Sequence, residues 1–258
     1  MTTLTLSTPI YNSHQLKQLT LILEDLLGDL SVEAKILGTQ ASRWVQLELS
    51  GEDETIATKL LEREAGGFCP VSLENVKKFA AQKGYVTGLE KNSTELTLDV
   101  GIFDPKPAYA TIPLSRLQAT LADGKEVSLK KLAELWGIGD NRPLEIKILE
   151  VDAKNSQLKA DLQPSQVHKL MQWRDSLLDR LIVLGASKNE LNVAVGQERL
   201  NRDVIETEAL GMFEYALVCK LGTDATGLIG RLGRRLRKAK FTVFNPKRVV
   251  EFSEKPQA

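Results

Sequence analysis

The middle of the chain alternates between apolar and polar residues in five short runs, and one helical pattern interrupts them. Alternation with a period of two residues is typical of strands that bury one face. Turn-forming residues separate the runs, as at Asp104-Pro105 and Gly139-Asp140. Five short strands with a helix between the third and the fourth are the pattern of a small closed barrel. We predict strands at residues 84–90, 95–103, 109–115, 143–152 and 157–163, and a helix at residues 128–137.

The segments on both sides of this barrel mix helical and extended patterns, so the predicted fold class is α+β with several domains. Residues 1–68 predict a small β-α-β-β-α domain, residues 69–163 hold the barrel, and residues 164–258 form a further α+β domain. A short helix at residues 72–84 is expected before the barrel. In the last domain we predict helices at residues 166–180 and 201–211 and between residues 220 and 241, and strands at residues 180–186, 190–196, 213–220 and 241–245.

The composition excludes several classes of protein. No run of residues approaches the ~18 apolar positions that a membrane span needs, and the first residues lack the pattern of a signal peptide. The two cysteines, Cys69 and Cys219, lie far apart and predict neither a disulfide framework nor a zinc site. With two histidines in the chain, His14 and His168, a histidine relay or multi-histidine metal site is not expected. We therefore expect a cytoplasmic protein that is not an enzyme and has no cofactor or metal.

A basic, glycine-rich segment near the C-terminus is the strongest compositional signal. The chain has 34 basic and 34 acidic residues, yet residues 226–248 contain eight basic residues and no acidic one. A P-loop is not predicted there. Leu228 and Ile229 follow Gly227, at the two positions where a P-loop requires lysine and then serine or threonine. The spacing of Gly227, Gly230 and Gly233 also differs from a dinucleotide-binding fingerprint. One continuous helix would place an apolar stripe opposite a stripe of Arg231, Arg234, Arg235 and Lys238.

Residues Leu228–Leu236 resemble the signature of KH domains, in which an apolar-Ile-Gly-x-x-Gly run joins two helices. Predicted strands flank this run, so the KH-like end covers residues 213–250. The resemblance implies a Gly230–Gly233 turn whose backbone approaches about four nucleotides while adjacent positive charges neutralise phosphates. Whether these residues form that turn or a continuous helix is left open by Leu232, an apolar residue inside the turn.

The barrel resembles an S1-type OB domain over about 80 residues. The matching elements are residues 84–86, 98–101, 112–117, 139–140 and 146–152. S1 domains bind single-stranded RNA on a face that carries aromatic and basic residues. The resemblance makes Tyr85, Phe103 and Tyr109 candidate stacking residues, and Lys106 and Arg116 candidate phosphate contacts, with a place in the barrel core as the alternative for each aromatic. A barrel that docks protein is the alternative to RNA binding by this face.

An S1-like barrel followed by a KH-like unit resembles the layout of Nus-type transcription elongation factors and of exosome cap subunits. The whole chain is also similar to an archaeal family with no assigned function. The layout implies a non-catalytic RNA-binding accessory factor that joins a ribosome, an RNA polymerase or an exosome-type complex. The alternatives are a protein-binding adaptor whose arginine face meets an acidic partner and, less favoured, an RNA-modifying enzyme. The predicted nucleic-acid-binding residues are Gly230, Arg231, Gly233, Arg234, Arg235, Arg237, Lys238, Lys240, Lys247, Arg248, Tyr85, Tyr109 and Arg116.

Overall fold

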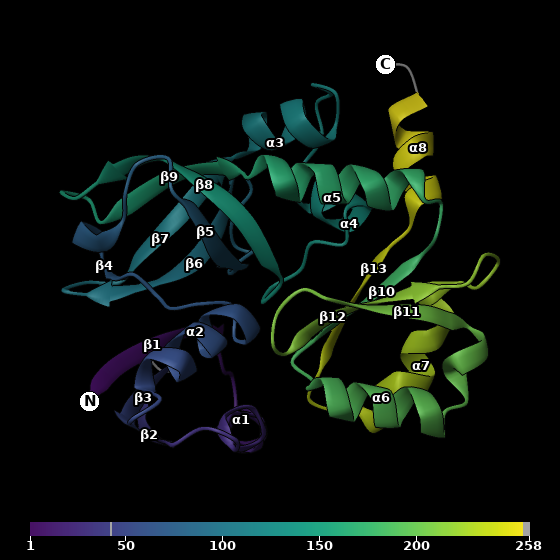
Figure 1. Ribbon diagram of the computed structural model, residues 1–258. Coiled ribbons are helices and arrows are strands. Elements are labelled where there is room, and N and C mark those ends of the chain that lie inside the picture. Colours follow the sequence, from purple (N-terminus) through teal and green to yellow (C-terminus); the bar gives the residue numbers. More distant parts are fainter. Residues whose placement is uncertain (42, 255–258) are drawn as a thin grey trace.

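The computed structural model of the protein describes residues 1–41 and 43–254, so the predicted domain 164–258 ends outside the described residues. Figure 1 shows a small α+β domain at the N-terminus, a barrel, and a second α+β domain that contains the C-terminal helix. The structure confirms the mixed α+β class and the five-stranded closed barrel.

The N-terminal domain has a three-stranded antiparallel sheet in the order β1-β3-β2. Two helices pack on it through Leu19 and Leu23 of the first helix and Leu61 of the second, which contact the buried face of the third strand. Residues 67–69 run beside β1 as a short fourth edge, since the Ser7 N–H donates to the carbonyl of Gly67. The order matches the predicted β-α-β-β-α pattern: β1 (Thr2–Pro9), α1 (Ser13–Leu27), β2 (Val32–Gln40), β3 (Trp44–Gly51) and α2 (Glu54–Glu64).

The barrel closes because β5 pairs with β6 and β8, β8 with β9, β9 with β7, and β7 with β6. The β7–β9 pair is parallel, and the others are antiparallel. This is the strand pairing of an OB fold, with two helices between its third and fourth strands. The elements are β4 (Val71–Ser72), η1 (Leu73–Asn75), β5 (Ala81–Val86), β6 (Glu95–Asp104), β7 (Ala108–Pro113), α3 (Leu114–Leu121), α4 (Leu129–Leu135), β8 (Pro143–Asp152) and β9 (Gln157–Leu162).

The predicted helix at residues 72–84 is wrong. A single 3-10 turn, η1, is followed by the first barrel strand, β5, which pairs with both β6 and β8. Residues 81–84 of the predicted helix pair with β8, and this pairing between strands outweighs the helical spacing of the local sequence.

After the barrel, α5 leads into a β-α-β-β-α-β domain whose sheet has the order β11-β12-β10-β13. This is the ferredoxin-like arrangement, and its first three strands are ordered as in the N-terminal domain. In Figure 1, α6 and α7 cover one face of the sheet, and α5 lies toward the other. The elements are α5 (Pro164–Asp175), β10 (Arg180–Leu184), α6 (Lys188–Gln197), η2 (Leu200–Arg202), β11 (Val204–Ala209), β12 (Glu214–Cys219), α7 (Ala225–Arg235), β13 (Lys240–Phe244) and α8 (Pro246–Glu254).

Two predicted elements of this domain are interchanged. Residues 190–196, predicted as a strand, belong to helix α6, which starts with a capping box between Ser187 and Glu190. Residues 201–211, predicted as an acidic helix, contain the edge strand β11. Charged residues are common on edge strands because they discourage pairing with other chains, so acidic composition here does not indicate a helix.

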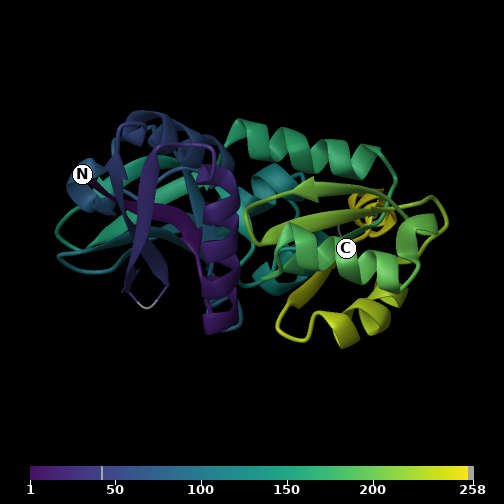
Figure 2. The same ribbon diagram turned by 60° about the horizontal axis from the view of Figure 1, so that its bottom comes forward.

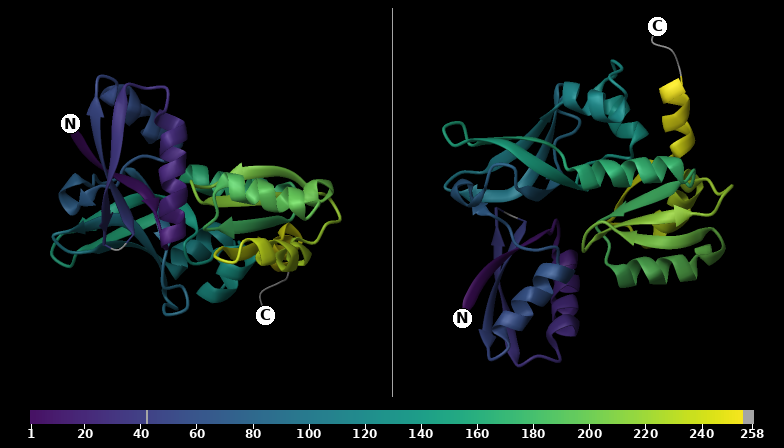
Figure 3. Two further views of the ribbon diagram at one scale, coloured as in Figure 1. Left: turned by 90° about the horizontal axis from the view of Figure 1, so that it is seen from below. Right: turned by 45° about the horizontal axis from the view of Figure 1, so that its top comes forward.

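The three domains share packed junctions. Met212 and Phe213, in the turn between β11 and β12, lie in the hydrophobic core of the N-terminal domain. On the other side of the C-terminal sheet, Phe244 packs against Trp136, which follows α4 of the barrel, and against Trp173 of α5. Helix α1 runs along the boundary between the N-terminal and C-terminal domains in Figure 2, and Figure 3 shows all three domains meeting in the middle of the molecule.

Candidate nucleic-acid interface

Helix α7 carries the glycine-rich segment as one continuous helix, so of the two alternatives the continuous helix forms and the Gly230–Gly233 turn implied by the KH resemblance does not. The Asp224 side chain accepts a hydrogen bond from the Thr226 N–H and starts the helix. Leu228, Leu232 and Leu236 follow at intervals of four residues and are buried against the sheet. Because this spacing requires helical geometry throughout, the burial of Leu232 excludes a break between the two glycines.

The glycines of α7 lie on its outer surface. A Cβ atom added to Gly227 or Gly230 would have nothing within 4 Å among the described residues, and one added to Gly233 would lie 3.8 Å from Phe241. No positive φ requires glycine at any of the three. Glycine inside a helix costs about 1 kcal/mol relative to alanine. The fold itself therefore gives no reason for these glycines.

Two of the predicted arginines are engaged with acidic groups of the chain. Arg235 Nε lies 2.8 Å from Glu198 Oε1, at the end of α6. Arg231 lies 3.8 Å from Glu198 Oε2 and 3.7 Å from Asp203 Oδ2, and it donates to the Glu198 carbonyl. The Arg235 hydrogen bond lowers the pKa of the Glu198 carboxyl. These contacts attach α7 to α6 and leave less positive charge available to a partner.

The other basic residues around the end of α7 are exposed, and none forms an ion pair within the described residues, where Arg234 attracts Glu198 only at longer range. Arg234 donates through Nε to the Gly230 carbonyl at 3.2 Å, as expected of a cation near a helix C-terminus. Arg235, Arg237 and Lys238 line a hollow of about 260 Å³ beside His14 and Glu190. We call the following set the basic corner: Arg234, Arg235, Arg237, Lys238 and Lys240.

Lys247 and Arg248 do not join the basic corner. Both are exposed on α8, beyond the far end of β13, whereas Lys240 begins that strand beside Leu184. Lys247 instead lines a hollow with Asp179 and Asp224. The eight basic residues that are close in sequence thus occupy two separate places in the fold.

The barrel face predicted to stack bases is covered by the N-terminal domain. Register places Tyr85, Asp99 and Tyr109 side by side on adjacent strands. Tyr85 is 1% exposed beneath Trp44, and Arg43 Nη1 lies 3.3 Å from Asp99 Oδ2. Tyr85 is therefore not available for stacking, which corrects the prediction.

The other predicted barrel residues differ in exposure. Tyr109 is 38% exposed and accessible to a partner. Phe103 packs partly buried beside the Trp44–Tyr85 cluster, and Lys106 is exposed. Arg116 Nη1 lies 2.9 Å from Asp161 Oδ2, so its charge is already matched.

Sequence reasoning missed Phe79. Its side chain is 60% exposed, and its backbone has the left-handed φ of +67° that large side chains rarely adopt. Lys78 Nζ lies 5.1 Å and Lys147 Nζ 5.4 Å from the ring centroid. We call these three residues the Phe79 platform. The signal in the sequence was the run Lys77-Lys78-Phe79, which the helix predicted at residues 72–84 obscured.

The described residues contain no cluster of three or more histidine, cysteine, aspartate or glutamate side chains that could hold a metal ion. Within the same residues, every helix is too short or too polar to cross a lipid bilayer.

Three family models match the chain in order. They are the DUF2110 N-terminal domain at residues 3–68, the DUF2110 central domain at residues 78–174 and the DUF2110 C-terminal domain at residues 178–244. No curated protein matches the sequence.

Among solved structures, the intact alpha subunit of aIF2 from Pyrococcus abyssi is 10% identical with a TM-score of 0.27, over 66% of this chain and 97% of that one. The a/eIF2alpha–aDim2p–rRNA complex from Pyrococcus horikoshii is 12% identical with a TM-score of 0.27, over 50% and 70%. An uncharacterized protein from Methanocaldococcus jannaschii is 12% identical with a TM-score of 0.23, over 34% and 95%.

Proposed function

We propose that this chain, which belongs to the DUF2110 family, is a non-catalytic RNA-binding factor that contacts RNA phosphates through the basic corner. The observation that carries the proposal is the exposure of Arg234, Arg237, Lys238 and Lys240 together at one end of α7, without acidic partners in the described part of the chain. Clustered cations without counterions raise the local potential and attract polyanions.

The glycine face of α7 supports the same proposal. Gly227 and Gly230 leave the helix backbone open on its outer side, beside Arg234. A flat helical surface lets a phosphate backbone approach closely, and arginine can donate two parallel hydrogen bonds to a phosphate. The Phe79 platform would supply a separate stacking contact for an unpaired base. We further propose that the protein acts in the cytoplasm as an accessory factor of the translation, transcription or RNA-processing machinery.

The test is RNA binding by a variant that removes the free charges and leaves the ion pairs of α7 intact. The variant is Arg234→Gln/Arg237→Gln/Lys238→Gln. The matched control is Lys130→Gln/Lys131→Gln/Lys154→Gln, which removes the same charge from exposed positions elsewhere. Fluorescence anisotropy with a labelled single-stranded RNA of about 20 nucleotides is measured at about 50 and 200 mM salt.

We expect the wild type and the control to bind RNA with a steep dependence on salt. The basic-corner variant should lose about two units of the slope of log K against log salt, since each lost phosphate contact removes about 0.7. Equal weakening by the two variants would show that net charge alone attracts RNA. If the wild type does not bind RNA at either salt concentration, the proposal fails.

A further inference from the structure

A cavity of about 330 Å³ lies between the barrel, α5 and the end of β11. Its charged lining residues are Lys83 of β5, Arg142 and Glu145 at the start of β8, and Lys169 of α5. This volume is at the lower end of the range for small-molecule sites. The cavity is on the side of the C-terminal sheet that faces α5, whereas the basic corner belongs to α7 on the other side.

Arg142 is the most unusual residue of this cavity. Its side chain is 1% exposed, and its Nη1 donates to the carbonyls of Trp136 and Gly137 at 2.6 and 2.7 Å. Its Nε is buried without a hydrogen-bond partner among the described residues, where Arg142 also has no carboxylate within ion-pair distance. Burial lowers the pKa of this guanidinium to about 9. Burying an unpaired charge is strongly unfavourable, so an anion bound beside Arg142 would stabilise the folded protein.

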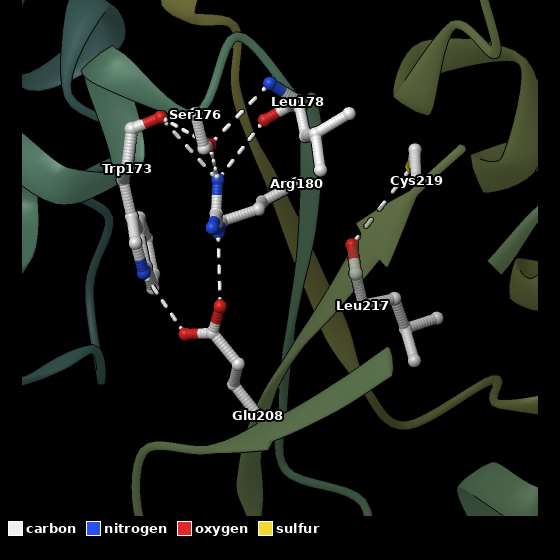
Figure 4. Close-up of polar contacts among 7 residues, drawn as sticks. All are labelled: Trp173, Ser176, Leu178, Arg180, Glu208, Leu217 and Cys219. Carbon is white, nitrogen blue, oxygen red and sulfur yellow. Dashed lines mark hydrogen bonds and ion pairs between the residues drawn. The ribbon is translucent and has the colours of Figure 1, made fainter. Parts of the chain in front are cut away.

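Neighbouring carboxylates are already engaged by other groups. Glu208 accepts from the indole N–H of Trp173 at 2.9 Å, and Arg180 Nε lies 3.2 Å from the same carboxylate, as Figure 4 shows. Ser165 donates to Glu145 at 2.6 Å. Arg142 lies 5.2 Å over the Trp173 ring, which provides a weaker contact than a counterion would.

Two lysines extend the positive charge of the cavity. Lys83 and Lys169 both line it, and neither has an ion pair within the described residues. Desolvation lowers the pKa of Lys169, and Glu208 opposes this shift. The lining itself contains three cations and one carboxylate, and Glu208 and Glu214 act on Lys169 and Lys83 from outside it. The excess of cations in the lining favours binding of a phosphate.

We propose that this cavity binds the phosphate group of a small phosphorylated molecule, with Arg142 and Lys169 as its main ligands. Guanidinium and ammonium groups placed together form charge-assisted hydrogen bonds to phosphate oxygens. Trp173 in the lining would report occupancy by its fluorescence, and the bound phosphate would compensate the charge of Arg142. This inference is independent of RNA binding by the basic corner.

The test is a titration of the full chain with inorganic phosphate, pyrophosphate and AMP at constant ionic strength. Binding is followed by calorimetry and by tryptophan fluorescence. Lys169→Gln removes a partly exposed ligand, and Arg142→Lys keeps the charge but loses the planar fork. The matched control is Lys154→Gln, which changes an exposed lysine of the barrel outside the cavity.

We expect saturable binding in the wild type and in Lys154→Gln, with an affinity at least about tenfold weaker in Lys169→Gln. Tighter binding of AMP than of phosphate would support a nucleotide as the source of the group, and equal binding would support the free ion. The proposal is overturned if none of the three probes binds at about 10 mM, or if Lys169→Gln and Lys154→Gln bind equally well. Since Lys169→Gln changes no buried contact of Arg142, this comparison stands even where Arg142→Lys fails to fold.

Discussion

Trp44 of the N-terminal domain meets Tyr85 of the barrel edge-on, with ring centroids 5.9 Å apart and an angle of 71° between the planes. Both side chains are 1% exposed, so the contact lies in the interior of the molecule. Edge-to-face aromatic pairs contribute about 0.5–1.5 kcal/mol beyond the area they bury. This pair attaches the N-terminal domain to the barrel face on which OB domains commonly bind ligands.

Removing Trp44 should loosen this attachment. We expect Trp44→Ala to lower the free energy of unfolding by about 3–5 kcal/mol, because it leaves a cavity in a packed interface. Urea unfolding measures the change. Trp44→Phe, which keeps an aromatic edge, should lose clearly less. If the two substitutions had equal effects, the edge contact would not contribute.

Freeing the paired arginines of α7 should strengthen RNA binding. Glu198→Gln removes the carboxylate that contacts Arg231 and Arg235. We expect a steeper salt dependence of RNA affinity, measured by anisotropy, and little change in stability, since these arginines are partly exposed.

The control for this change is Glu150→Gln, which alters net charge equally but frees Lys159 on the barrel. An equal gain in RNA affinity from both variants would assign the effect to net charge and not to α7.

Alanine at Gly230 should stabilise the protein. The helix is continuous at this position and has open space around it, so Gly230→Ala should add about 1 kcal/mol to the free energy of unfolding. Thermal unfolding measures the effect. A destabilised Gly230→Ala would favour the turn that the KH resemblance implied.

Gly101→Ala is the contrasting control, because its φ is +74° and its Cβ would clash with Cys69 Sγ. It should destabilise the protein. RNA affinity that falls in Gly230→Ala while stability rises would indicate that RNA approaches the glycine face.

The Phe79 platform should contribute to binding of unpaired bases without contributing to stability. Phe79→Gly removes the ring and relieves the strained φ of +67°, so the protein should remain as stable or become slightly more stable. Its affinity for single-stranded RNA should fall by about 1–3 kcal/mol, the usual contribution of a stacked base. Phe79→Tyr should bind like the wild type. Unchanged affinity in Phe79→Gly would exclude a stacking role.

The buried Glu214 should make stability depend on pH. Burial raises the pKa of its carboxyl from the ordinary 4.5 to about 8, although the backbone of Phe213 and the charge of Lys83 oppose this rise. The folded protein therefore keeps a proton between these two values that the unfolded chain releases. The contribution of Glu214 to the free energy of unfolding should be largest below pH 4.5 and fall toward pH 8, by at most about 1.4 kcal/mol per pH unit.

Urea unfolding between pH 5.5 and 8.5 tests this expectation. Glu214→Gln has no carboxyl to titrate, so its stability should vary less over this range than that of the wild type. Parallel pH profiles for the two proteins would show that Glu214 does not control the dependence.

Much of the fold could be predicted because the apolar residues of a barrel strand recur at every second position, as in Leu144, Ile146 and Ile148 of β8. The interchange of α6 and β11 had a different cause. Leu191, Val193 and Val195 alternate as in a strand, but Val193 is 49% exposed on a helix. Short segments with valine are ambiguous until it is known which neighbours they pack against.

The candidate sites were less predictable for a similar reason. The positive charge of α7 follows from the sequence, but the ion pairs that Arg231 and Arg235 form with Glu198 depend on how α6 docks. Tyr85 was assigned to a surface that another domain covers. Arg142 gave no sequence signal, because a single arginine at a strand start is usually solvated.

The insertion of Met212 and Phe213 into the N-terminal core determines when the N-terminal domain can finish folding during translation. The sequence of the N-terminal domain ends with the strand-like segment at residues 67–69. Met212 and Phe213, which complete its core, are synthesised about 145 residues later. Before Met212 and Phe213 are synthesised, they cannot bury the apolar surface around Leu6 and Leu19. Completion of this core must therefore wait until Met212 and Phe213 have been synthesised, and the nascent N-terminal domain is exposed to aggregation or chaperone binding in the meantime.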